Sequence, residues 1–140
     1  MFLAQPGEFG DIRLINTNTL AYIGDAVYEL YIREHAMQIR MENVDMMSSL
    51  TVKYVKAESQ ALGIKAIFDN LSEEEQSVVR RGRNRKIRST PRAVDPVIYK
   101  TATGLEALIG YLYIKGEDER LTEVILMIID AIDRDRRAHV

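Results

Sequence analysis

Residues 17–33, TNTLAYIGDAVYELYIR, decide how this chain folds. From Leu20 to Ile32 nearly every residue is apolar, which is typical of a helix that is buried on most of its sides. Asp25 interrupts this run directly after Gly24. An ionised carboxylate in a buried helix costs several kcal/mol unless it is paired or bound to a metal. The position of Asp25 therefore predicts a partner for its carboxylate.

The composition indicates one domain in a reducing compartment. The chain has 140 residues, 46% of them apolar, which is enough for a single domain with a real core. It has no cysteine, so disulfides and thiolate metal sites are excluded. The N-terminal residues do not resemble a secretory signal, and no apolar segment reaches the length of a membrane span. We therefore expect a cytoplasmic protein that has no membrane partner.

The spacing of apolar residues predicts helices throughout, so the expected fold class is all-α. Ser72 and Glu75 have the spacing of a capping box, and Asp95 followed by Pro96 is a typical helix start. We expect one domain over residues 1–140. The predicted helices are 17–37, a long helix from Val44 that Gly63 kinks or weakens, a helix from Ser72 that Gly82 ends or bends, 95–115 closed by Gly116, and 117–136.

A second apolar helix, TATGLEALIGYLYI at residues 101–114, carries Glu106 at its centre. Two central helices are thus each predicted to bury a carboxylate. Either the acids are structural and paired with Arg or Lys, or they bind a hard divalent cation such as Mg²⁺. Glu29 lies one turn after Asp25, so it is either a third acid of the site or the partner of Arg33.

The stretch RRGRNRKIRSTPR at residues 80–92 holds seven basic residues and no acid. Such a run indicates a polyanion partner, and its arginines, amides and hydroxyls suit phosphate groups. A solvated helix end is the alternative, because cations are favourable at the negative pole of a helix. The candidate RNA-binding residues are Arg80, Arg81, Arg83, Asn84, Arg85, Lys86 and Arg88.

Together, the arginines and the acids have the layout of a metal-dependent phosphodiesterase. LAYIGDAVYELYIR resembles the signature helix of the ribonuclease III catalytic domain, NERLEFLGDAVL, and TATGLEALIGYLYI resembles its second acidic helix, ADxFEALIGAIYLD. A catalytic domain alone, with VKAESQA, RRGRN and STPR, is similar to the Mini-III subgroup. The resemblance covers roughly residues 16–121.

The resemblance implies a helical homodimer that binds double-stranded RNA in a groove along its two-fold axis. Each of two sites uses Mg²⁺-assisted hydrolysis and leaves a 5′-phosphate, a 3′-hydroxyl and a short 3′ overhang. Asp25 and Glu106 match the catalytic, metal-binding acids of the family. Mini-III enzymes are linked to maturation of large-subunit (23S) ribosomal RNA, so the implied substrate is its precursor, and a ribosomal protein is a further partner to consider.

The chain also departs from the family pattern. Ordinary ribonuclease III has glutamates where this chain has Asn18 and Ala21, and an aspartate where it has Thr103. The acid cluster is therefore poorer, and we consider Glu29 and Thr103 as residues that support the acids without binding metal. Two alternative functions stay open: a non-catalytic RNA-binding or ribosome-assembly factor with this fold, and a helical interaction module whose basic stretch binds protein or membrane.

Overall fold

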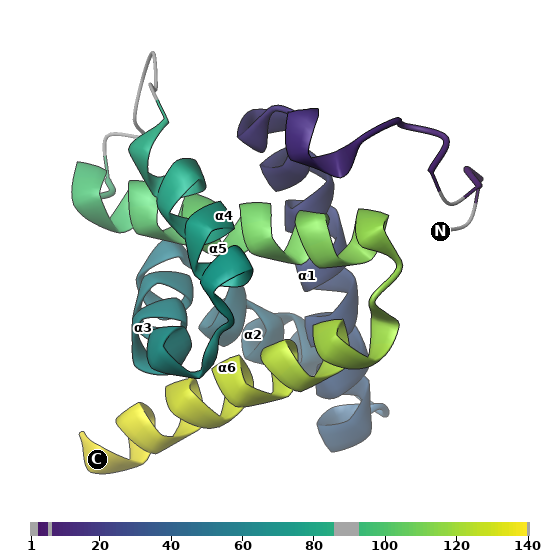
Figure 1. Cartoon of the computed structure of the whole chain (residues 1–140). Coiled ribbons are helices and arrows are strands. Elements are labelled where there is room, and N and C mark those ends of the chain that lie inside the picture. The colour runs from purple at the N-terminus through teal and green to yellow at the C-terminus, as the bar shows by residue number, and fades with distance from the viewer. Residues whose placement is uncertain (1–2, 6, 86–92, 140) are drawn as a thin grey trace.

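The computed structural model describes residues 3–5, 7–85 and 93–139, and these residues form an all-helical fold without strands (Figure 1). The predicted fold class is therefore confirmed. No helix in the described ranges is both long enough and apolar enough to span a membrane. The elements are η1 (Ile12–Leu14), α1 (Thr17–Arg40), α2 (Val44–Val55), α3 (Ala57–Ile67), η2 (Phe68–Asn70), α4 (Glu73–Asn84), α5 (Pro96–Lys115) and α6 (Asp118–Ala138).

Helix α5 is the centre of the fold, and α1, α3 and α4 all pack against it (Figure 1). Most of its residues are buried from Thr101 to Leu112, as the apolar sequence around its whole circumference predicts. Helix α6 crosses below and packs mainly on α3. The core is continuous from α1 through α5 to the isoleucines of α6.

Local capping signals predicted the helix ends well. The capping box of Ser72 and Glu75 is present at the start of α4. The Asp95 carboxylate accepts from the first backbone amides of α5, and Pro96 occupies the first turn. Gly116 ends α5 in the left-handed conformation, with φ of 80°, which glycine adopts without strain.

Two predictions about interior glycines were wrong. The long helix after Val44 is broken at Lys56, whose ψ of 149° separates α2 from α3, and Gly63 lies inside α3. Helix α4 continues through Gly82 to Asn84. Both glycines serve packing: an added Cβ would lie 2.8 Å from Ile128 Cγ2 at Gly63 and 2.9 Å from Ala107 Cβ at Gly82.

The crossing of α1 and α5 brings two backbones into direct contact. A Cβ on Gly24 would lie 1.7 Å from the carbonyl oxygen of Glu106, and one on Gly110 would lie 1.9 Å from the carbonyl oxygen of Leu20. No side chain fits at either position, because the neighbour is backbone and cannot turn aside. The two glycines therefore set the depth of the crossing, and Asp25 follows one of them directly.

We predict that Gly24→Ala lowers the free energy of unfolding by about 2 to 4 kcal/mol, because overpacking at a fixed backbone forces the helices apart. Urea unfolding followed by circular dichroism measures this loss. Gly63→Ala is the matched comparison: its new methyl meets a side-chain atom, Cγ2 of Ile128, and not a backbone atom, so a smaller loss is expected. An unchanged midpoint for Gly24→Ala would contradict the crossing.

Candidate active site

The α1–α5 crossing brings the two predicted acids together. Asp25 follows Gly24, and Glu106 is the residue whose carbonyl faces that glycine. The side chains of Asp25 and Glu106 interact by a hydrogen bond, and both line one cleft of about 610 Å³. Its lining residues are Asn18, Ala21, Tyr22, Ile23, Asp25, Ala26, Glu29, Arg85 and Glu106.

The expectation that both acids are buried was wrong for Asp25. Its side chain is exposed, whereas Glu106 is largely withdrawn from solvent. Helix α1 is apolar on most sides, but one stripe with Tyr22, Ala26 and Leu30 faces outward, and Asp25 lies beside it. The cost of desolvation therefore falls on Glu106, while the Asp25 carboxylate stays hydrated.

Burial raises the pKa of Glu106 from 4.5 to about 8, and the negative charge and hydrogen bond of Asp25 add to this shift. The positive charge of Arg85 and a hydrogen bond from Gln60 oppose it. Without a cation, the Glu106 carboxyl therefore holds its proton near neutral pH. A divalent cation between them would favour loss of that proton.

Arg85 is the one Lys or Arg among the described residues that lines the acid cleft. It follows the last residue of α4, and its Nη1 donates a hydrogen bond to Oδ1 of Asn18 on α1. Asn18 precedes Asp25 by seven residues and therefore lies on the same face of α1. The predicted role of Arg85 in RNA binding thus concerns the acid cleft itself.

Gln60 on α3 is a site neighbour that sequence reasoning missed. Its side chain is 3% exposed, its Nε2 donates to the carbonyl oxygen of Val55 at 2.8 Å, and its Oε1 is buried without a partner. Its amide also interacts with Glu106. The available signal was Gln60 directly before the apolar Ala61 and Leu62 in VKAESQALGI, because a buried amide needs polar neighbours.

The remaining predicted residues divide into three groups. Arg81 and Arg83 are exposed on α4, and Arg80 on the same helix lies 5.7 Å from the ring centre of Phe68. Asn84 is the last residue of α4 and is exposed. Lys86 and Arg88 lie outside the described residues.

The two predicted supporting residues have different surroundings. Glu29 lines the cleft and forms an ion pair with Arg33 at 3.1 Å, which favours the structural alternative for this acid. Thr103 is buried, and its hydroxyl donates to the carbonyl oxygen of Tyr99 on its own helix at 3.0 Å. Thr103 is not among the residues that line the cleft.

The donor set suits a hard cation held by few protein ligands. Two carboxylates meet in a cleft of oxygen-bearing side chains, and Mg²⁺ typically takes one or two carboxylates and keeps several waters. No cluster of three or more His, Cys, Asp or Glu residues suited to a metal occurs in the described part of the chain. Asp25 and Glu106 are therefore the residues that would hold the ion.

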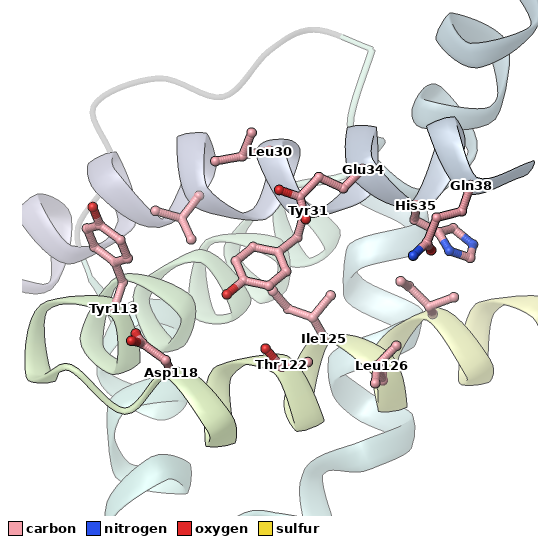
Figure 2. A pocket seen from close by; sticks show the side chains of 12 residues that line it. Leu30, Tyr31, Glu34, His35, Gln38, Tyr113, Asp118, Thr122, Ile125 and Leu126 are labelled. Atoms are coloured by element: carbon pink, nitrogen blue, oxygen red, sulfur yellow. The ribbon is translucent and has the colours of Figure 1, made fainter. Parts of the chain in front are cut away.

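A second hollow, of about 530 Å³, lies between α1 and α6 (Figure 2). Tyr113 and Asp118 lie at one end and His35 and Gln38 at the other, with Tyr31 between them. Its acidic lining residues are Glu34 and Asp118, and no Lys or Arg of the described part of the chain lines it. A phosphate backbone would be repelled there, which leaves the Asp25–Glu106 cleft as the candidate active site.

Comparison with known proteins agrees with this fold. Residues 18–117 match the family model described as the ribonuclease III domain. The chain is 50% identical over 114 residues to a Mini-ribonuclease 3 of Thermoanaerobacter sp., covering 81% of this chain and 80% of the relative. It is 44% identical over 116 residues to that of Symbiobacterium thermophilum, covering 83% and 89%.

A solved structure supports the same assignment. A crystal structure of a Fusobacterium nucleatum protein superimposes with a TM-score of 0.77 at 34% identity, covering 86% of this chain and 96% of that one. The fold, the paired acids and these matches define an endoribonuclease of the ribonuclease III type. The chain belongs to the ribonuclease III family, among the Mini-ribonuclease 3 proteins. Expectations of family and enzyme class are thereby confirmed.

The raised pKa of Glu106 predicts a pH-dependent stability in metal-free buffer. The folded protein holds the Glu106 proton more tightly than the unfolded chain, so this contribution is complete below pH 4.5 and is lost as the pH rises to about 8. Glu106→Gln removes the titration, so its stability relative to the unchanged protein should increase across this window, by on the order of a few kcal/mol. Urea unfolding at several pH values in EDTA measures it. A difference in unfolding free energy between the two proteins that stays constant with pH would contradict the raised pKa of Glu106.

Proposed function

We propose that this endoribonuclease hydrolyses double-stranded RNA with Mg²⁺ bound by Asp25 and Glu106, acting in the cytoplasm on the precursor of large-subunit (23S) ribosomal RNA. The observation that carries the proposal is the meeting of the two acids with Arg85 in one cleft. Acids that hold a metal and a cation that attracts phosphate are the two requirements of a metal-assisted phosphodiesterase. Asp25 and Glu106 stand at the positions of the family's two motif acids, although Asn18, Ala21 and Thr103 depart from the pattern of ordinary ribonuclease III.

The bound metal would activate a water and stabilise negative charge on the phosphate. Asp25, which is hydrated, is ready to take up an ion, whereas Glu106 must first release its proton. The walls of the cleft, formed by Ala21, Ile23 and Ala26, limit the water around Glu106. Hydrolysis adds water across the P–O bond and leaves a 5′-phosphate and a 3′-hydroxyl.

Exposed arginines on α4 support a duplex substrate. Arg81 and Arg83 each lie one residue from Gly82, in the helix that leads to Arg85. Both are exposed, so both are accessible to an RNA backbone that approaches α4. Duplex RNA is recognised mainly through its shape, phosphates and 2′-hydroxyls, so a set of arginines without interleaved aromatic residues suits it.

We also propose a homodimer formed through the N-terminal half of α1. Tyr22 is 82% exposed, and with Phe9 and Leu3 it lines an apolar hollow of about 550 Å³. An exposed apolar surface of this kind indicates an interface. Tyr22 and Ile23 line both this hollow and the acid cleft, so a second copy docked here would lie beside the candidate site and bring two sites into one groove.

Asp25→Asn and Glu106→Gln should each reduce cleavage of a long RNA duplex on the order of a thousandfold, because losing a metal ligand removes several kcal/mol of transition-state stabilisation. Gel assays with and without Mg²⁺ measure cleavage, and a binding assay should show duplex RNA still retained. Glu34→Gln is the control on the same helix, outside the cleft. Cleavage by Asp25→Asn at the rate of the unchanged protein would contradict the proposal.

Tyr22→Lys should convert the dimer to monomers, because it places a charge in the apolar interface. Sedimentation velocity measures the mass of the particle, and circular dichroism checks that the helices persist. Leu126→Lys is the matched control: it places the same charge on an exposed leucine of the α1–α6 hollow. A Tyr22→Lys protein that stays dimeric while Leu126→Lys dissociates would move the interface to α6.

A further inference from the structure

We propose that Arg85 is a catalytic residue, whose guanidinium contacts the phosphate that is cut and stabilises its charge in the transition state. This inference rests on the proposed function of the Asp25–Glu106 pair and deepens it. The alternative is that Arg85 is one of several arginines that attract the RNA backbone at a distance from the reaction. The contacts of Arg85 distinguish it from those arginines.

The position of Arg85 is fixed by packing on both sides. Three residues earlier, Gly82 lies so close to α5 that an added Cβ would be 3.0 Å from the Cα of Gly104 and 2.9 Å from the Cβ of Ala107. This contact holds the last turn of α4 beside Glu106. On the other side, the hydrogen bond to Asn18 ties the guanidinium to α1. Arg85 is accordingly half-buried, whereas Arg83 is exposed.

The charge of Arg85 is not cancelled by a direct partner. Arg13, Arg33, Arg120 and Arg134 each have a carboxylate within 3.1 Å. Arg85 has no ion pair within the described residues, although it lines a cleft with acids. Its tether is the neutral amide of Asn18, which orients the guanidinium without neutralising it. The cation therefore stays available to an anion that enters the cleft.

One donor of Arg85 also lacks an acceptor. Its Nε is buried and makes no hydrogen bond within the described residues. Leaving a buried donor unpaired costs roughly 1 to 3 kcal/mol. No hydrogen bond to Nε within the described residues offsets this cost, which is typical of a group placed for function. A guanidinium offers a fork of donors that matches two phosphate oxygens.

The chemistry gives such a cation a defined task. A phosphate must approach two carboxylates, and negative charge accumulates on its oxygens as water adds and the P–O bond breaks. A fixed cation at that point interacts more strongly with the transition state than with bound RNA. Loss of Arg85 should therefore lower kcat more than it raises KM.

The first test is steady-state cleavage of a short RNA duplex in Mg²⁺. Arg85→Ala should lower kcat by about 100-fold or more with a smaller change in KM. Arg85→Lys should recover part of this loss, because it restores the charge but not the fork. Arg134→Ala, which removes an arginine outside the cleft, should match the unchanged protein. A raised KM with unchanged kcat for Arg85→Ala would overturn the proposal.

The second test needs no RNA. Removing a positive charge beside two carboxylates should tighten binding of Mn²⁺ to the free protein, by about threefold or more. Titration calorimetry with Mn²⁺ measures this for Arg85→Ala. Catalysis would then fall while metal affinity rises, a combination that a merely damaged site does not give. Weaker Mn²⁺ binding in Arg85→Ala would show a structural role and overturn the proposal.

Asn18→Ala tests the tether. It should lower kcat less than Arg85→Ala, and the double variant should be no worse than Arg85→Ala alone, because Asn18 acts through the guanidinium. Additive losses would overturn that link. Asp25→Asn distinguishes failure of the proposed function from failure of the Arg85 proposal. If Asp25→Asn still cleaves RNA, the proposed function is wrong. If Asp25→Asn is inactive and Arg85→Ala has an unchanged kcat, only the catalytic role of Arg85 is wrong.

Discussion

The backbone contact between α1 and α5 is the constraint on which the rest of the structure depends. Gly24 lies against the carbonyl of Glu106, and Gly110 lies against that of Leu20. This closeness joins two carboxylates from residues 81 positions apart (106 minus 25) without any covalent or metal link. A side chain at either glycine would separate the helices, and the acids would no longer share a cleft. The same close contact between α1 and α5 therefore packs the core and sets the geometry of the site.

Electrostatics then divides the two acids into different roles. Glu106 lies under the crossing, so its carboxyl favours the protonated form, while Asp25 remains in water. Ionisation of both acids would require positive charge beside them, and Arg85 is the only described Lys or Arg that lines the cleft. The guanidinium of Arg85 is hydrogen-bonded to the neutral amide of Asn18 and not to a third carboxylate. The net charge of the cleft can therefore change when a metal or a phosphate binds. A third acid in place of Asn18 would form an ion pair with the guanidinium and offset its positive charge.

The sequence predicted what depends on neighbouring residues and missed what depends on distant ones. Ser72, Asp95 and Gly116 cap helices through contacts within a few residues, so their roles follow from local spacing. Gly63 and Gly82 look like breaks locally, but their packing partners Ile128 and Ala107 are far along the chain. The motif predicted that Asp25 and Glu106 belong together; the exposure of Asp25 and the approach of Gln60 depend on which helices cover α1 and α5. No spacing in one sequence contains that information.

The exposed stripe on α1 connects the proposed site with the proposed assembly. Tyr22, Ala26 and Leu30 are one turn apart and exposed, and Asp25 lies at the edge of the same stripe. A partner on this stripe would cover one side of Asp25 and leave the side that faces Arg85 open. It would also reduce the water around the hydrated acid and strengthen its interaction with a cation. Dimer formation and metal binding should therefore favour each other, because each lowers the cost of the other at the same carboxylate.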